Sequence, residues 1–184
     1  MLYIIRHGRT DWNDDHRIQG RTDTELNESG RKMAAEAAVE YRDINFDICY
    51  CSPLKRAKET AEILLKGRDI PIITDDRLME MSFGKFEGLK EAFQIPDCPV
   101  NGFFNNPETY VPVEGGGESL DELFSRSGSF LEEMVEPGLK EGKDILIVGH
   151  GALNSSIICR IKYGCDRSRF WEDGIPNCKL MRLK

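Results

Sequence analysis

Short apolar runs rich in β-forming residues alternate along this chain with longer segments of helical periodicity, and this alternation constrains the fold most. The strand-like runs cover residues 1–5, 46–51, 71–74, 144–148 and 178–183. The helix-like segments cover residues 27–41, 52–65, 119–136 and 152–161. Alternating strands and helices favour parallel pairing, because each helix provides the crossover that two parallel strands require. The pattern predicts an α/β fold: a single three-layer α/β/α domain with a mostly parallel central sheet.

Capping signals indicate where several of these helices begin and end. Asn27 is placed to act as the N-cap of the first helix. Ser52-Pro53 is expected to open the second, since proline is tolerated in a first helical turn. Ser119 and Glu122 have the spacing of a capping box, and Pro137-Gly138 is expected to end the helix that follows.

Length and charge exclude several classes of protein. A chain of 184 residues fits one domain. The net charge of -7 argues against a nucleic-acid-binding protein, which needs a basic face. No apolar run approaches the roughly 20 residues of a membrane helix, so no membrane association is expected. Arg6 interrupts the apolar start before it could serve as a signal peptide, which predicts a cytoplasmic protein.

The six cysteines show no pattern of a metal or redox site. None of them belongs to a C-x-x-C pair, and no secretory signal accompanies them. We therefore interpret all six as reduced thiols that act as small buried apolar side chains.

Charged and histidine side chains follow three of the strand-like runs. Arg6 and His7 come directly after the first run, Arg56 lies just past the second, and His150 follows the run 144–148. The carboxyl ends of parallel strands meet at one edge of a sheet, where α/β proteins bind their ligands. Helix N-termini at the same edge would add backbone N–H donors and partial positive charge. The sequence therefore predicts a site for phosphate or a similar anion.

The helical and strand periodicities fade between residues 85 and 117. Four prolines lie within this segment, and Gly115-Gly116-Gly117 closes it. We expect an excursion over the surface with one short helix near Lys90. A long irregular connection of this kind is often functional, so residues 85–117 are expected to form a lid or a substrate-specificity segment.

Four sequence blocks occur together in a fixed order, and they carry a family resemblance. They are residues 6–13 (RHGRTDWN), 52–61 (SPLKRAKETA), 80–88 (EMSFGKFEG) and 148–151 (VGHG). Residues 117–119 and 176–178 are weaker supporting matches. A single Arg-His-Gly would be a weak signal, but four blocks spanning nearly the whole chain are specific. The chain resembles the histidine phosphatase superfamily, also called the phosphoglycerate-mutase-like family, and within it the phosphatase branch.

The resemblance implies a set of five catalytic residues. His7 would be the nucleophile that accepts the phosphoryl group, with its other ring nitrogen fixed by a backbone carbonyl near residue 8. Arg6 and Arg56 would bind phosphoryl oxygens through forked hydrogen bonds. His150, expected to be cationic, would give a further donor. Glu80 would act as general acid and then as general base.

The resemblance also implies substrate contacts and a way to stabilise charge. Asn13, Gln19, Gly20 and Gly151 are expected to bind the substrate. The guanidinium groups would supply the positive charge that a metal ion provides in many phosphoryl-transfer enzymes. We therefore expect no metal and no cofactor.

Several neighbouring residues have competing interpretations. Glu87 is the alternative to Glu80 as the general acid. His16 is interpreted as a solvated surface residue, and Trp12 and Trp171 as packing residues. Arg9 and Arg21 could either contact substrate or form surface salt bridges, and those two interpretations stay open.

The function expected from these features is a metal-independent phosphatase. It would hydrolyse small phosphomonoesters through a phosphohistidine on His7, with a small phosphorylated metabolite as its partner. A phosphoglycerate-type mutase is the first alternative, although family mutases tend to be longer and to enclose the site more fully. A non-catalytic phospho-ligand-binding module is the second.

Overall fold

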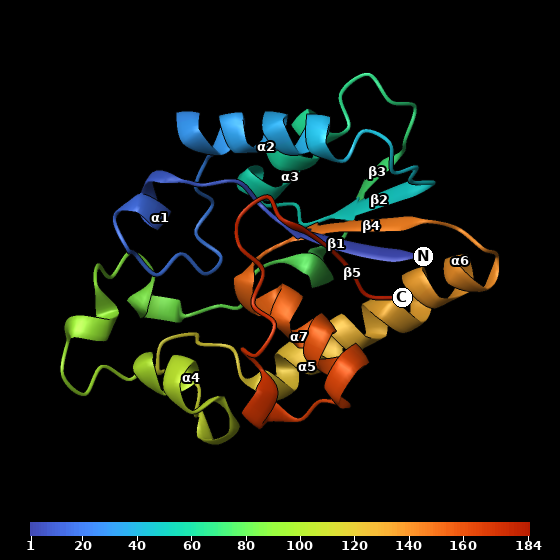
Figure 1. Ribbon diagram of the computed structural model, residues 1–184. Helices are drawn as coiled ribbons and strands as arrows, with labels where there is room; N and C mark the ends of the chain where they lie inside the picture. The colour runs from blue at the N-terminus through green and yellow to red at the C-terminus, as the bar shows by residue number, and fades with distance from the viewer.

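The computed structural model describes residues 1–184. At its centre is a five-stranded sheet with the strand order β3-β2-β4-β1-β5 (Figure 1). The strands are β1 (Leu2–Arg6), β2 (Ile48–Cys51), β3 (Ile72–Thr74), β4 (Ile145–Gly149) and β5 (Leu180–Arg182). All neighbouring pairs are parallel except β1 with β5, which is antiparallel at the sheet edge. The predicted single α/β domain with a mostly parallel sheet is confirmed.

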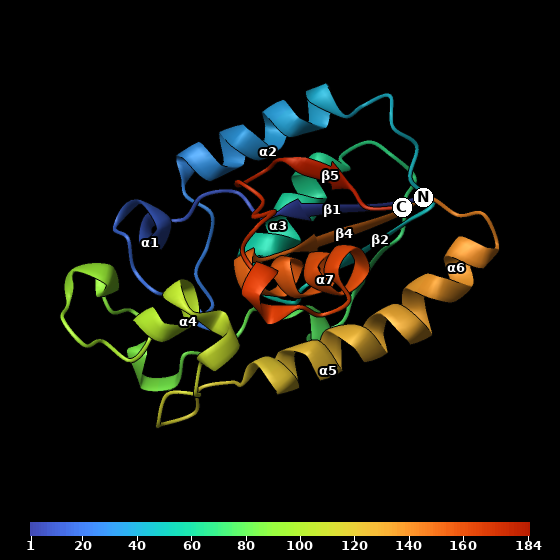
Figure 2. The ribbon, with the colours of Figure 1, turned by 60° about the horizontal axis from the view of Figure 1, so that its bottom comes forward.

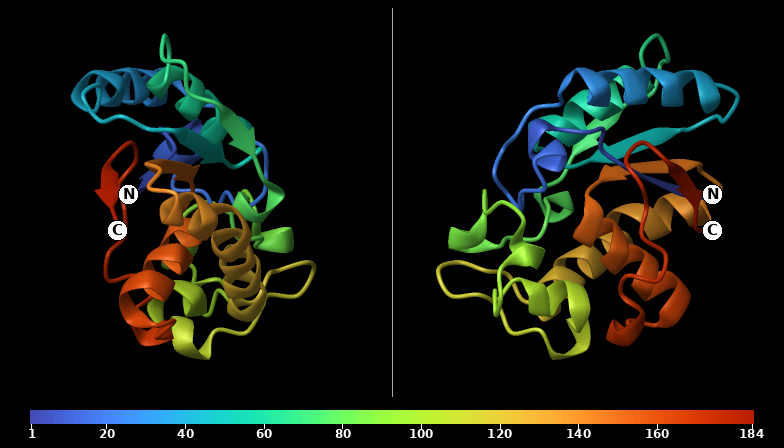
Figure 3. Two further views of the ribbon diagram at one scale, coloured as in Figure 1. Left: turned by 90° about the vertical axis from the view of Figure 1, so that its right-hand side faces the viewer. Right: turned by 60° about the vertical axis from the view of Figure 1, so that its left-hand side comes forward.

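Helices cover both faces of this sheet and give the predicted three layers. The α-helices are α1 (Asp11–Asp14), α2 (Glu28–Glu40), α3 (Lys55–Leu64), α4 (Asn101–Asn105), α5 (Leu120–Phe130), α6 (Glu136–Lys140) and α7 (Gly151–Tyr163). Figure 2 shows α2 and α3 on one face of the sheet and α5 and α7 on the other, and the side views of Figure 3 show the same layers. None of the helices combines the length and the apolar character needed to cross a bilayer.

Alternate side chains of β1 enter two separate cores, because successive residues of a strand point to opposite faces. Tyr3 and Ile5 pack with the apolar residues of α2 and α3. Leu2 and Ile4 pack with those of α5 and α7. All five residues of β4 are buried, which is typical of a parallel strand covered on both faces.

Two of the expected helix caps are present. The Asn27 side chain accepts a hydrogen bond from the backbone N–H of Gly30 at 2.8 Å, at the start of α2. Ser119 and Glu122 form a reciprocal capping box at the start of α5: the Ser119 Oγ accepts from the Glu122 N–H at 3.1 Å, and Glu122 Oε2 accepts from the Ser119 N–H at 2.8 Å. These local signals are therefore sufficient to position both helix starts.

One expected helix start and one expected helix end are wrong. The second helix begins at Lys55, after the Ser52-Pro53 pair that was expected to open it. The helix that starts at residue 120 does not end at Pro137-Gly138, but continues through a π-helical turn at Leu131–Val135 into α6. Pro137 lies in the first turn of α6, directly after the π-helical turn, where the hydrogen-bond register changes.

Residues 85–117 contain more structure than the sequence predicts. Besides α4, 3₁₀ turns occur at Ala92–Gln94 and Pro107–Thr109. Val100 and Phe103 are fully buried in the core that α5 and α7 share. A few apolar side chains between the prolines therefore anchor the segment to the core, while most of its residues are exposed or half-buried, so its expected role as a lid or substrate-specificity segment stays a prediction.

Five of the six cysteines are buried and only Cys165 is partly exposed. Cys49 and Cys51 lie in β2, where burial raises the pKa of the Cys51 thiol to about 11. These thiols therefore behave as small apolar side chains at neutral pH, as expected.

Candidate active site

The pairing of β1 with β4 brings the two histidines of the predicted site together. The register aligns Arg6 with Gly149, so that His7 and His150 are the next residues on neighbouring strands. The His7 N–H donates to the Gly149 carbonyl at 3.0 Å, and the two imidazole rings lie 5.1 Å apart between centroids. The predicted convergence of the strand ends is confirmed.

Arg56 is placed by the first turn of α3, and the loop before α2 holds its guanidinium. Nη1 donates to the Thr22 carbonyl at 2.8 Å and Nη2 donates to the Gly20 carbonyl at 2.7 Å, while the buried Nε has no partner. Gly20 has a φ of +54°, and a Cβ there would collide with the Glu87 carboxylate. Burial lowers the pKa of Arg56 to about 10, so the side chain remains a cation at neutral pH.

Arg6, the last residue of β1, provides a second cation. Its Nε is buried and makes no hydrogen bond. Burial lowers the pKa of Arg6, and the nearby Glu80 carboxylate partly opposes this shift. A buried guanidinium donor without an acceptor is costly, so it marks a place where an anion can bind.

The His7 ring is held in one tautomer. Its Nδ1 lies 2.6 Å from the Gly8 carbonyl oxygen, which is the backbone anchor expected near residue 8. Burial, and then the positive charge of Arg56, hold the pKa of His7 well below its ordinary value. In the neutral ring, Nδ1–H donates to Gly8, and Nε2 keeps a free lone pair.

The surroundings of His150 disfavour the cationic form that the sequence analysis expects. Burial, followed by the charge of Arg56, lowers the pKa of His150 well below its ordinary value. Both ring nitrogens are buried and have no hydrogen-bond partner. A neutral imidazole still carries one N–H, and His150 can therefore donate a single hydrogen bond to a bound anion.

Two residues that sequence reasoning did not assign to the site hold the His7 backbone in place. Thr60 Oγ1 in α3 accepts from the Gly8 N–H at 3.0 Å, and Asn177 Nδ2 donates to the His7 carbonyl at 2.7 Å. A Cβ on Gly8 would lie 2.5 Å from the Gly30 carbonyl oxygen, so this close approach requires glycine. The block at residues 176–178 was a signal for Asn177; Thr60 carried only the signal of a buried helix face.

Glu80 faces the N-terminus of α7. Its Oε1 accepts from the Leu153 N–H at 3.0 Å and from the Met81 N–H at 2.9 Å, and its Oε2 accepts from the Ala152 N–H at 3.2 Å. A Cβ on Gly151 would lie 3.6 Å from Glu80 Oε2. The carboxylate is thus oriented by the positive end of a helix and stands beside Arg6.

Glu87, the alternative general acid, is engaged elsewhere. Its Oε2 accepts from the N–H and hydroxyl of Thr22 at 2.8 and 2.6 Å. Its Oε1 accepts from the N–H groups of Arg21 and Phe83 at 3.0 and 3.1 Å. Glu87 therefore joins two loops and does not line the pocket, whereas Glu80 does.

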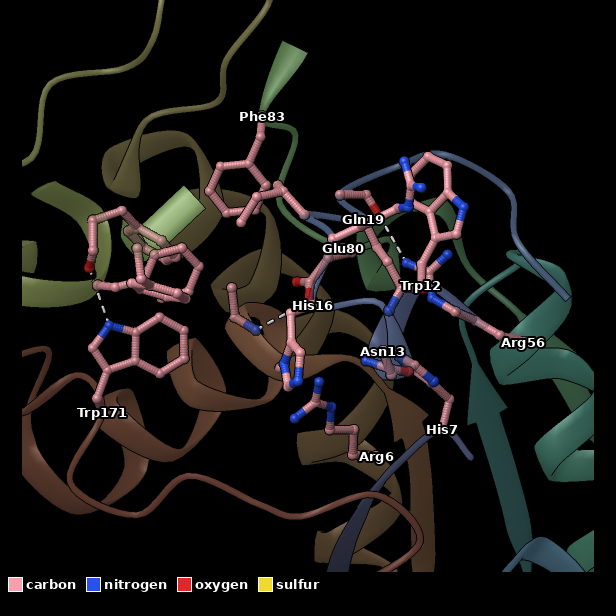
Figure 4. A pocket seen from close by; sticks show the side chains of 18 residues that line it. Arg6, His7, Trp12, Asn13, His16, Gln19, Arg56, Glu80, Phe83 and Trp171 are labelled. Carbon is pink, nitrogen blue, oxygen red and sulfur yellow. Dashed lines mark hydrogen bonds between the residues drawn. The ribbon is translucent and has the colours of Figure 1, made fainter. Parts of the chain in front are cut away.

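These side chains surround a pocket of about 320 Å³ (Figure 4). Eight of the nine residues named from the sequence line it: Arg6, His7, Asn13, Gln19, Gly20, Arg56, Glu80 and Gly151. The ninth, His150, is fully buried and lies against the His7 ring. The structure therefore brings all nine to one place.

The amide side chains of Asn13 and Gln19 are oriented by hydrogen bonds to their oxygens. Asn13 Oδ1 accepts from the Thr10 N–H at 3.1 Å. Gln19 Oε1 accepts from the hydroxyls of Thr10 and Thr24 at 3.0 and 2.8 Å. With their oxygens engaged, both residues present amide nitrogens as donors to the pocket.

Some residues near the pocket combine their expected role with a place in its wall. His16 is exposed and Trp171 packs against the core, as expected, and both also line the pocket, as Trp12 does. Arg9 pairs with Asp14 at 2.6 Å, which matches the surface salt bridge that was one of its two interpretations.

Comparison with known protein families identifies the family of this chain. Residues 2–184 match the model of the histidine phosphatase superfamily (branch 1). The chain belongs to this superfamily. Its fold is accordingly the phosphoglycerate-mutase-like fold that the four sequence blocks predict.

Three histidine phosphatase relatives show how far the similarity extends. A 2,3-bisphosphoglycerate-dependent phosphoglycerate mutase of Cytophaga hutchinsonii is 37% identical over 153 residues, covering 82% of this chain and 72% of the relative. Phosphoserine phosphatase 1 of Hydrogenobacter thermophilus is 30% identical over 176 residues, covering 96% and 82%. The solved structure of YhfR from Bacillus stearothermophilus superposes with a TM-score of 0.86 at 31% identity, covering 97% of this chain and 88% of that one.

Proposed function

We propose that this histidine phosphatase homologue is a phosphatase that hydrolyses small phosphomonoesters through a phosphohistidine on His7. The observation that carries the proposal is the state of His7. Its Nδ1 is anchored to Gly8, its ring lies in a pocket with Arg6, Arg56 and Glu80, and burial lowers its pKa, which favours the neutral ring. A neutral nucleophile beside unsatisfied guanidinium donors fits the attack on a phosphoryl group.

In the first step, His7 Nε2 attacks phosphorus in line with the ester oxygen. The N–P bond forms as the P–O ester bond breaks. Arg6 and Arg56 bind the equatorial oxygens, whose negative charge their guanidinium groups stabilise. The leaving oxygen takes a proton from the Glu80 carboxyl group and departs as an alcohol.

In the second step, water attacks the phosphoryl group of phospho-His7. The Glu80 carboxylate takes one proton from this water, and the O–P bond forms as the N–P bond breaks. Inorganic phosphate is released, and both His7 and Glu80 return to their starting states. Asn13, Gln19, Gly20 and Gly151 are proposed to position the phosphoryl group and its substituent.

Acid-labile labelling tests the nucleophile. After a short incubation with a ³²P-labelled phosphomonoester and quenching in alkali, the label should lie on His7 and should be lost in acid. The H7A variant should carry no label and show no turnover, whereas the control variant V111A, which changes an exposed residue outside the pocket, should keep both. Label on serine or cysteine would refute the proposal, and tight phosphate binding without any turnover would indicate a binding module.

The two arginines supply the charge for which many phosphoryl-transfer enzymes use a metal ion, so we propose that the activity needs no metal. Turnover should survive exhaustive chelation with EDTA. A loss of activity that Mg²⁺ or Zn²⁺ restores would overturn this part of the proposal.

A phosphoglycerate-type mutase is the second candidate, because the relative from Cytophaga hutchinsonii bears that name. A mutase returns the phosphoryl group to a second hydroxyl and must keep water away from phospho-His7. Incubation with 3-phosphoglycerate and catalytic 2,3-bisphosphoglycerate, followed by ³¹P NMR, distinguishes the two. We expect inorganic phosphate; accumulation of 2-phosphoglycerate would favour the mutase.

A further inference from the structure

One side of the pocket is built from aromatic rings. Phe83, Phe93, Phe103, Phe104 and Trp171 line it, and we call these five residues the aromatic wall. In Figure 4, Phe83 and Trp171 stand on one side of the pocket, while Arg6, His7 and Arg56 stand on the other. A phosphomonoester with its phosphoryl group at His7 would therefore extend its organic group toward these rings.

Contacts among the rings fix the aromatic wall. Phe104 lies at its centre, stacked on Trp171 with centroids 5.6 Å apart and in edge contact with Phe93 at 4.8 Å. Trp171 Nε1 donates to the Phe103 carbonyl at 3.1 Å, which ties the C-terminal part of the chain to α4. The rings are thus pre-organised, and a ligand that contacts them need not order them first.

Phe93 has an unusual exposure for so large an apolar side chain. Its side chain is 61% exposed, although it lines the pocket together with the buried Phe83 and Phe103. An exposed phenyl ring at the edge of a cavity is covered by water unless a ligand covers it. An apolar ligand would therefore gain free energy by displacing that water.

The pocket offers only one further cation for a second anionic group, and that cation is already paired. Arg17 is the only arginine or lysine that lines it besides Arg6 and Arg56. The Arg17 Nε donates to Asp15 at 3.0 Å and its Nη1 donates to the Gly88 carbonyl at 3.2 Å. A substrate carboxylate would have to share Arg17 with Asp15 or compete with the phosphoryl group for the two catalytic arginines.

Arg21, just outside the pocket, is similarly engaged. It pairs with the buried carboxylate of Glu118 at 3.3 Å and its Nε donates to the Glu80 carbonyl at 3.2 Å. The surface salt bridge that was one interpretation of Arg21 is therefore present. Both arginines near the mouth are therefore already paired with a carboxylate of the protein, with which a substrate carboxylate would have to compete.

We propose that the preferred substrates are phosphate monoesters of alcohols that carry an aromatic ring, and not phosphorylated hydroxy or amino acids. The proposal rests on the phosphatase function above and adds the substrate class. The aromatic wall binds the ring of the alcohol, Phe93 covers its outer face, and the engaged arginines disfavour a carboxylate. The substrate class thus differs from the one in the name of the phosphoserine phosphatase relative.

The substrate test compares alkyl esters, so that the leaving groups have similar chemistry. Benzyl phosphate and 2-naphthylmethyl phosphate should be hydrolysed with a kcat/KM at least about tenfold higher than O-phosphoserine or 3-phosphoglycerate, because each buries an apolar ring. Equal or faster hydrolysis of O-phosphoserine would overturn the substrate class while leaving the phosphatase function intact.

Variants of Phe93 test the role of the aromatic wall without disturbing the core. F93A should lower kcat/KM for benzyl phosphate about three- to tenfold, mainly through KM, and leave inhibition by inorganic phosphate unchanged. F93Y should retain the wild-type value. The matched control is V111A, which changes a 76% exposed apolar residue of the same segment outside the pocket. If F93A behaves like V111A, Phe93 does not contact the substrate.

Calorimetry with phosphonates decides the same question even if no ester is hydrolysed. Benzylphosphonate should bind at least about tenfold more tightly than 3-phosphonopropionate, which carries a carboxylate in place of the ring. Tighter or equal binding of 3-phosphonopropionate would overturn the inference. A protein that binds benzylphosphonate but hydrolyses no phosphomonoester would instead disprove the proposed function.

Discussion

Mild acid should destabilise this protein through His7 and His150. Both rings are buried and flanked by arginines, and both pKa values lie well below the ordinary one. In the unfolded chain each histidine titrates near its ordinary pKa of about 6.5. Below that pH the unfolded state binds more protons than the folded state, so stability is greatest above it and decreases as the pH falls.

The size of this effect follows from proton linkage. Between pH 7.5 and pH 5.5, protonation of one ordinary histidine stabilises the unfolded chain by about 1.4 kcal/mol when the folded-state pKa lies below this range. For the two rings together the loss is about 2.7 kcal/mol. This is a large fraction of the roughly 5–15 kcal/mol by which a domain is stable.

Urea unfolding at the two pH values measures the loss. Other groups also titrate, so the informative quantity is the difference between wild type and the double variant H7Q/H150Q. Wild type should lose about 2.7 kcal/mol more than the double variant and about 1.4 kcal/mol more than either single variant. H16Q, which removes an exposed ring, should keep the full wild-type pH dependence. Equal pH dependence in wild type and H7Q/H150Q would refute both the depressed pKa values and the neutral nucleophile.

Three further predictions follow from contacts in and around the site. G8A should lose about 1–3 kcal/mol of stability in urea unfolding, since its Cβ would lie 2.5 Å from the Gly30 carbonyl oxygen; an unchanged midpoint would contradict this packing. R6M should unfold no more easily than wild type in phosphate-free buffer, because it removes an unsatisfied buried donor. It should lose the stabilisation that added phosphate gives to the wild type. A markedly lower urea midpoint would show that Arg6 has a structural role. E118A should lower the free energy of unfolding by about 3 kcal/mol, because it removes the carboxylate that lies 2.6 Å from Arg126 Nε. The double variant E118M/R126M should recover most of that loss. A double variant as unstable as E118A would argue against the pair.

The sequence predicts helix starts correctly where a few neighbouring residues decide the structure. The Asn27 cap and the Ser119–Glu122 capping box each depend on side chains within three residues. The helix end predicted at Pro137-Gly138 is wrong because the structure there depends on the preceding turn and not on the proline alone. The π-helical turn at Leu131–Val135 changes the hydrogen-bond register before the proline, and no signal in the sequence announces that change.

The anchoring of residues 85–117 to the core could not be predicted, because the apolar residues of this segment follow no helical or strand period. Phe103 is fully buried and Phe104 contacts Trp171, but this pairing joins positions far apart in the chain. Five of the nine phenylalanines lie between residues 83 and 104. That concentration was a usable signal for an apolar surface near the site, although it could not show which rings face the pocket.

The sequence by itself determined the α/β architecture and the segments that form the pocket, because strand and helix periods are local and a parallel sheet brings its strand ends to one edge. Only the tertiary structure decided that the neutral forms of His7 and His150 are favoured, because their pKa values depend on burial and on arginines from other elements. It likewise decided that the arginines near the mouth are engaged by acidic side chains and that the opposite side of the pocket is aromatic. Such properties arise from distances between residues remote in the chain, which composition and periodicity do not encode.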